Sequence, residues 1–136
     1  MSLALLTVAC ALSACVQPAS AGSVKGWCAE VIKLNTKYGT MRNKRYVLPS
    51  QVSLSAWKHL VDATLAERAR YIALAPSSIK TAVKHQITWY VKVKANHYSR
   101  TTPYKPLTRT DITKLTNFQG AHCGVTYAGD WPLPPS

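Results

Sequence analysis

Two cysteines, Cys28 and Cys123, lie near the two ends of the part of the chain that can fold, and they constrain this sequence more than any other feature. The other two, Cys10 and Cys15, belong to an apolar N-terminal run, LALLTVACALSACV, which is short for a membrane span and typical of a signal peptide. Outside the cytosol an even pair of thiols oxidises to a disulfide. We therefore expect one bridge, Cys28–Cys123, that closes a loop of nearly the whole domain.

The apolar run predicts export by one of two routes. Ala19-Ser20-Ala21 fits the small-x-small rule for cleavage before Gly22, and this is the favoured route, with residues 1–21 as the signal peptide. The segment that ends at Cys15, Leu-Ser-Ala-Cys, resembles a bacterial lipobox, in which Cys15 would be lipidated. Both routes predict a mature protein that is secreted or held at the cell envelope, outside the cytoplasmic membrane.

Apolar residues recur every three or four positions in four stretches, which is the spacing of an amphipathic helix. The predicted helices cover about 24–38, 52–74, 77–98 and 110–122. Four helices joined by loops favour an all-α domain over 22–125, a four-helix bundle in which the disulfide links the first helix to the last. Residues 126–136 predict an extended, proline-rich tail.

Two alternatives remain within these helices. Thr64-x-x-Glu67 matches a capping box, so a second helix could start inside the stretch 52–74. Residues 87–93, ITWYVKV, are rich in β-branched and aromatic side chains and taken alone would suit a strand. The helical period on both sides favours a continuous helix in each case.

The charge of the chain is strongly one-sided. Lys and Arg number 17 against five Asp and Glu, which gives a formal net charge of +12. Charged residues make up only 16% of the chain and hydrophobic ones 47%, which is typical of a globular domain rather than a disordered basic tail. Because a merely soluble surface mixes both signs, the scarcity of acids indicates an anionic partner.

The basic residues fall into clusters beside aromatic rings. The candidate anion-binding residues are Arg42, Lys44 and Arg45 in the connector 39–50, and Lys80, Lys84 and Lys92 along one side of the third helix. His85 and Trp89 adjoin the second cluster, and Lys105 with Arg109 forms a third. Cations interleaved with aromatic rings can hold phosphates or acidic polymers, whereas the alternative is a solvated helix face and two solvated loops.

Three short motifs carry a family resemblance. They are Trp27-Cys28 at the start of the first helix, Ala75-Pro76 followed by Ile79-Lys80 at a helix break, and Cys123-Gly124-Val125 at the end of the domain. In these motifs the chain resembles the small exported two-cysteine helical proteins of actinobacteria. The resemblance covers about 28–125 and implies a four-helix exported domain with no catalytic residues to carry over.

The sequence offers little for catalysis or metal binding. The histidines at 59, 85, 97 and 122 lack metal-ligand spacing, and the five acids are scattered over different elements. No serine lies in a nucleophile-elbow motif. We therefore expect no enzyme activity, no metal and no cofactor.

The leading hypothesis is a basic, monomeric, non-enzymatic binding protein of the cell envelope that recognises an anionic polymer, lipid or small ligand. Association with a membrane surface fits this hypothesis, and sequence-specific binding of nucleic acid is not expected. A second hypothesis is a secreted effector or inhibitor that acts on another cell or protein. A third is a carrier of haem or another small ligand, in which Tyr or His would ligate the iron.

Overall fold

The computed structural model describes residues 22–128. The predicted signal peptide, the lipidation candidate Cys15 and the tail from residue 129 lie outside the described residues. The helices are α1 (Val24–Lys37), α2 (Leu54–Ala66), α3 (Arg68–Leu74), α4 (Lys80–Ala95) and α5 (Arg109–Phe118), and the short segments are β1 (Met41–Arg42), β2 (Arg45–Tyr46), the 3-10 turn η1 (Pro49–Gln51), the π-helical turn η2 (Gln119–Cys123) and β3 (Thr126–Tyr127). The prediction of a mostly helical domain is thus confirmed.

Helix α1 agrees with the first predicted helix to within one residue. The Ser23 hydroxyl caps its first turn by accepting a hydrogen bond from the Gly26 N–H at 3.0 Å. The helix ends just before Gly39, whose φ of 74° lies in the left-handed region that favours glycine. Its predicted apolar stripe is buried, and Trp27 and Val31 are fully inaccessible.

The single helix predicted over 52–74 is two helices, so the favoured assignment was wrong and the alternative break occurs. The break lies at Glu67, which ends α2 and precedes α3. It does not use the proposed capping box, because Glu67 makes no side-chain cap and the Thr64 hydroxyl donates to the Leu60 carbonyl at 2.8 Å. Back-bonding of this kind by a threonine bends a helix.

The last two predicted helices are confirmed with shorter bounds. Helix α4 runs without interruption through Ile87 and Val93, so the strand alternative is wrong there. Helix α4 begins after its N-cap residue Ile79 rather than at the predicted residue 77. Helix α5 begins at Arg109, one residue before the predicted start, and Thr108 caps it: its hydroxyl accepts a hydrogen bond from the Asp111 N–H at 3.1 Å, while the Asp111 carboxylate accepts one from the Thr108 N–H.

A small three-stranded sheet, which the sequence did not reveal, covers one edge of the domain. Strands β1 and β2 form an antiparallel hairpin, and β3 pairs with β2 in parallel. The two residues of the hairpin turn, Asn43 and Lys44, both have positive φ (49° and 58°), as a primed two-residue turn requires. Thr126 and Tyr127, predicted to begin the tail, form β3 instead.

The predicted disulfide is confirmed. Cys28 and Cys123 are bonded, with their Cα atoms 5.2 Å apart. The bridge joins the first turns of α1 to the end of η2, which directly follows α5. It therefore fastens the two ends of the described chain to each other.

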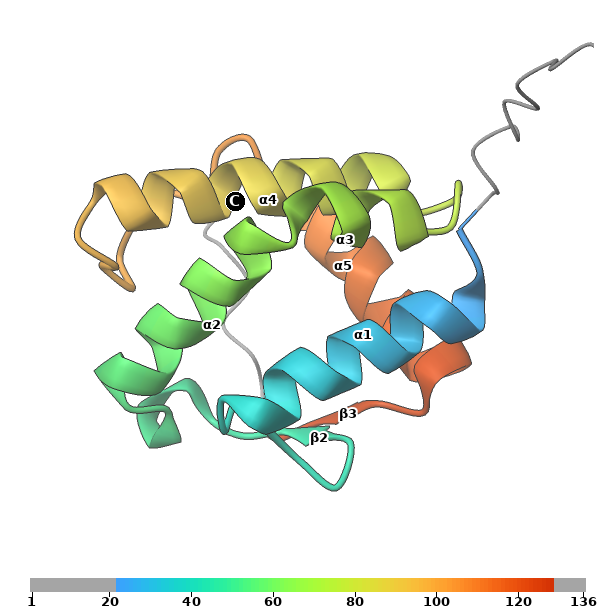
Figure 1. Cartoon of the computed structure of the whole chain (residues 1–136), viewed down its shortest axis with the longest axis horizontal. Helices are drawn as coiled ribbons and strands as arrows, with labels where there is room; N and C mark the ends of the chain where they lie inside the picture. The colour runs from blue at the N-terminus through green and yellow to red at the C-terminus, as the bar shows by residue number, and fades with distance from the viewer. Residues whose placement is uncertain (1–21, 129–136) are drawn as a thin grey trace, which may run out of the picture.

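The helices do not form a pure four-helix bundle. Figure 1 shows them as a frame, with α4 along one side, α1 along the opposite side, and α2 and α5 connecting them. Helix α4 packs against both α2 and α5, while α1 packs against η2, α3 and α2. The fifth helix and the sheet complete this frame, and side chains from all of its members converge on its middle.

Candidate functional site

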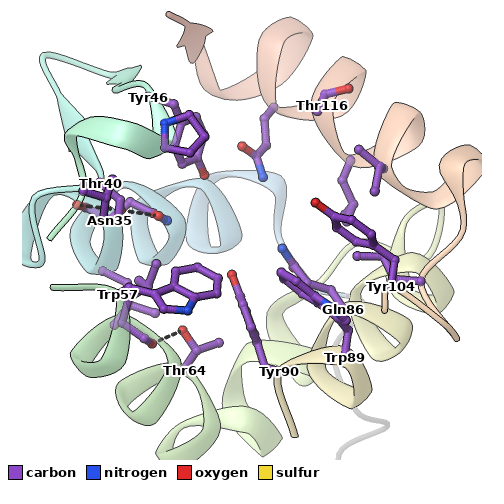
Figure 2. A pocket seen from close by; sticks show the side chains of 18 of the residues that line it. Asn35, Thr40, Tyr46, Trp57, Thr64, Gln86, Trp89, Tyr90, Tyr104 and Thr116 are labelled. Carbon is purple, nitrogen blue, oxygen red and sulfur yellow. Dashed lines mark hydrogen bonds between the residues drawn. The ribbon is translucent and has the colours of Figure 1, made fainter. Parts of the chain in front are cut away.

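The middle of the frame holds a cavity of about 250 Å³. Residues from all five α-helices, from both turns η1 and η2, and from β2 and β3 contribute to its wall. Figure 2 looks into this cavity and shows the labelled side chains arranged around it. The domain is thus built around the cavity, because each described helix presents a side chain to it.

One wall of the cavity is a continuous aromatic surface. The ring centroid of Trp89 lies 5.2 Å from that of Tyr90 and 5.1 Å from that of Tyr104, and the Tyr104 ring stacks on it at 13°. Trp57 extends this surface from α2, 5.9 Å from Tyr90. The two indole N–H groups point into the wall, since Trp57 donates to the Tyr98 carbonyl at 3.1 Å and Trp89 is 3.5 Å from the Thr102 carbonyl. This side of the cavity is therefore lined by aromatic rings that also pack on one another.

A second aromatic pair comes from the small sheet. Tyr46 of β2 and Tyr127 of β3 stack with centroids 5.0 Å apart and an angle of 17°. The Tyr127 hydroxyl donates to Gln119 Oε1 at 3.0 Å. The parallel pairing of β2 and β3, with Tyr46 opposite Tyr127, is what places these two rings beside each other.

Most polar side chains in the wall have partners within the protein. Asn35 Nδ2 donates to the Val31 carbonyl at 2.9 Å, and the Thr40 hydroxyl donates to Asn35 Oδ1 at 2.7 Å. The Thr64 hydroxyl donates to Leu60, so both threonines have satisfied donors (Figure 2). These groups make the cavity wall stable without a ligand.

Gln86 on α4 is the exception. Its Oε1 atom is buried and has no hydrogen-bond partner among the described residues. Figure 2 shows the Gln86 side chain between Trp89 and Tyr104 at the edge of the cavity. A buried carboxamide oxygen without a donor costs about 1–3 kcal/mol. Gln86 is therefore the group in this wall that most needs a hydrogen bond from a bound molecule.

The cavity wall carries almost no charge. Burial raises the pKa of Tyr90 to about 12 and raises the pKa values of Tyr46 and Tyr71 well above the usual range, so these phenols are neutral. Among residues 22–128, no acidic residue and no histidine lines the cavity, and Arg100 is the single charged residue in its wall. The Arg100 guanidinium donates to the carbonyls of Pro49, at 2.8 Å, and Val52. An uncharged ligand fits this wall best.

The loop between α4 and α5 covers one side of the cavity and is tied down at several points. Arg100 fastens it to η1, and the Trp57 indole holds the Tyr98 carbonyl. The Tyr98 hydroxyl donates to Asp62 Oδ1 at 2.8 Å, and Lys94 Nζ lies 2.8 Å from the same oxygen. The hydrogen bond from Lys94 lowers the pKa of Asp62. The loop is therefore held as a fixed part of the wall.

The structure separates the predicted anion-binding residues. Arg42, Lys44 and Arg45 are exposed at the β1–β2 hairpin, while Lys84 and Lys92 are exposed on α4 and the neighbouring Lys80 is half-buried. Figure 1 places the hairpin and α4 on opposite sides of the frame. None of the six lines the cavity, and they do not converge on one site.

Two residues that were predicted to adjoin the lysine cluster on α4 have other roles. Trp89 is only 9% exposed and belongs to the cavity wall. His85 binds Asp111 of α5, with Nδ1 2.8 Å from Oδ2. The cavity was not predicted, because Trp57 and Tyr90 also fit an ordinary helical core stripe. The signal in the sequence was the high content of Trp and Tyr among those stripes, against a single Phe.

Within residues 22–128, no cluster of three or more His, Cys, Asp or Glu side chains could hold a metal ion. None of the helices in that range combines the length and the apolar character needed to cross a bilayer.

The chain matches no protein-family model, no curated protein and no solved structure. The resemblance to exported two-cysteine proteins therefore stays a prediction, and function has to be inferred from the cavity and the surface.

Proposed function

We propose that this protein is an exported, non-enzymatic binding protein that holds one small, uncharged, ring-containing molecule in its central cavity. The observation that carries the proposal is the aromatic wall of Trp57, Trp89, Tyr90 and Tyr104 around a cavity of about 250 Å³, with the unpartnered Gln86 oxygen at its edge. Small-molecule sites typically combine apolar, aromatic walls with a few polar groups that fix orientation.

The volume limits the size of the ligand. A cavity of about 150 Å³ in another protein takes up benzene, so 250 Å³ suits a molecule of about two fused rings. Haem is far larger than this, and no histidine lines the cavity, which argues against the haem alternative. The aromatic rings of the wall favour a ligand that itself contains a ring, since pairs of aromatic rings gain stability beyond the area they bury.

The chemistry of the wall limits the charge that a ligand can carry. A cation would lie among neutral phenols in a protein of net charge +12, and the described part of the wall has no carboxylate to balance it. An anion would find a single arginine, whose guanidinium is already bonded to two carbonyls. A donor on a neutral ring, by contrast, would satisfy Gln86 Oε1.

Calorimetric titration of the folded, oxidised protein with three probes of one ring system tests the proposal. Indole is neutral and carries an N–H donor, indole-3-carboxylate is anionic and tryptamine is cationic. We expect indole to bind with a dissociation constant below about 0.1 mM and both charged probes to bind at least tenfold more weakly. Equal affinity for the three probes, or no binding of indole, would contradict the proposal.

A further inference from the structure

A second depression lies on the outer side of α5, away from the central cavity. It is an open groove of about 820 Å³ between the turn that leads into α4 and helix α5. Helix α5 separates the two sites, because Ile112 and Leu115 face the cavity whereas Thr113, Lys114 and Asn117 face the groove. No residue lines both sites.

Arginine and lysine supply the permanent charges in the described lining of the groove. Arg109 and Lys114 line it and are both exposed, and neither makes an ion pair within residues 22–128. None of the described residues that line the groove is acidic. Asp111, the one acid on α5, is turned toward α4, where His85 holds its carboxylate. Neither cation is therefore neutralised by the fold.

Polar donors follow the two cations along the same side of the helix. Thr110, Thr113 and Asn117 line the groove and are exposed, at the three- and four-residue spacing of one helix face. The apolar lining residues include the buried Ile79 and Phe118, whose ring centroid lies 4.4 Å from that of His122 with the two rings tilted by 37°. Helix α5 has ten residues, so the groove runs along a face about 15 Å long.

We propose that this groove binds a stretch of an extended anionic polymer. An elongated channel with spaced cations and hydroxyl donors fits repeated negative charges along a chain better than one compact anion. The apolar lining residues would contact the backbone of the polymer between its charged groups. This site is independent of the central cavity, so a ligand could occupy each of them at the same time.

The test measures polymer binding by calorimetry at low ionic strength. Inorganic polyphosphate, polygalacturonate and polyglutamate serve as probes, because they carry phosphate, sugar carboxylate and peptide carboxylate groups. We expect polyphosphate or polygalacturonate to bind, and the tighter of the two identifies the charged group that the groove prefers. Binding of polyglutamate alone would overturn the proposal in favour of an acidic protein partner, and binding of none would overturn it outright.

A matched pair of double variants distinguishes binding in the groove from attraction by the overall positive charge of the protein. Arg109→Gln with Lys114→Gln removes two charges from the groove, and Arg42→Gln with Arg45→Gln removes two from the hairpin on the sheet. We expect the groove variant to lose at least tenfold in polymer affinity and the hairpin variant to lose less than threefold. Equal losses of affinity would show that the overall positive charge attracts the polymer and would overturn the proposed site.

A third variant tests the shape of the groove without a change of charge. Thr113→Trp places a large ring in the groove on an exposed position, and we expect it to weaken polymer binding at least fivefold. Indole binding in the cavity and the helical circular dichroism should stay as in the wild type, which shows that the variant is folded. Unchanged polymer affinity in this folded variant would contradict binding along the groove.

Discussion

The two ends of α1 take part in regions of opposite character. Near its start, Trp27 is fully buried and packs against Phe118 and Tyr71, with centroids 5.6 and 6.0 Å away, beside the disulfide. Near its end, Asn35 lines the cavity. The first region is a close-packed core closed by a covalent bond, and the second keeps a hollow among aromatic rings. The difference shows that one helix can contribute at one end to a core closed by a disulfide and at the other to the wall of a cavity.

The largest expected effect is on the free energy of unfolding and comes from a change in the packed region alone. Replacing both cysteines, Cys28→Ser with Cys123→Ser, removes a cross-link between residues 95 positions apart. We expect a loss of about 4–5 kcal/mol in the free energy of unfolding, measured by urea denaturation. Indole affinity of the molecules that remain folded should change less than threefold. A tenfold loss of affinity in that folded fraction would show that the two regions are not separate.

A smaller effect, on indole affinity, is expected from a substitution that fills the hollow region. Leu115→Trp puts a larger side chain into the cavity wall, and we expect indole affinity to fall at least tenfold. Val91→Trp is the control, because Val91 is 48% exposed on α4 and does not line the cavity. Calorimetry on both variants measures the effect. Equal affinities for indole would place the ligand elsewhere.

Substitutions of the two glutamines in the cavity wall are expected to have opposite effects on stability. Gln86→Leu removes an acceptor that lacks a donor, so we expect a gain of about 1 kcal/mol in unfolding free energy together with a loss of indole affinity. Gln119→Leu removes the acceptor of the Tyr127 hydroxyl and should cost about 1 kcal/mol. Thermal denaturation with and without indole measures both. A Gln86→Leu variant that is less stable than the wild type would contradict an unsatisfied oxygen at Gln86, and unchanged indole affinity would contradict its role in ligand binding.

The smallest expected effect concerns pH. Burial of Asp111 opposes its charge, but hydrogen bonds from Thr108 and His85 outweigh this and lower its pKa. A carboxylate with a lowered pKa in the folded state adds stability above its unfolded pKa of about 3.9, and this stability is lost as the pH falls through the folded value. We expect Asp111→Asn to reduce the acid-induced loss of stability by less than about 1 kcal/mol. Melting temperatures from pH 6 down to pH 2 measure this, and an unchanged pH profile would contradict it.

The packed region was predictable from the sequence and the hollow one was not. The period of Trp27 and Val31 and the pairing of Cys28 with Cys123 follow from local spacing and from the count of cysteines. The cavity depends on where α2 breaks at Glu67 and on how β3 returns to β2, and both result from contacts between distant segments. Apolar spacing marks Trp57 and Tyr90 as buried, but it cannot tell a filled core from the wall of a cavity.

The most direct test of the account is an NMR titration of the wild-type protein with indole, observed at the indole N–H signals of its tryptophans. Trp57 and Trp89 line the cavity, whereas Trp27 lies in the packed region and serves as the internal reference. We predict saturable shifts at Trp57 and Trp89 with little change at Trp27. Shifts at Trp27 that equal those at Trp57 and Trp89, or no shift at any of them, would contradict a ligand site in the central cavity.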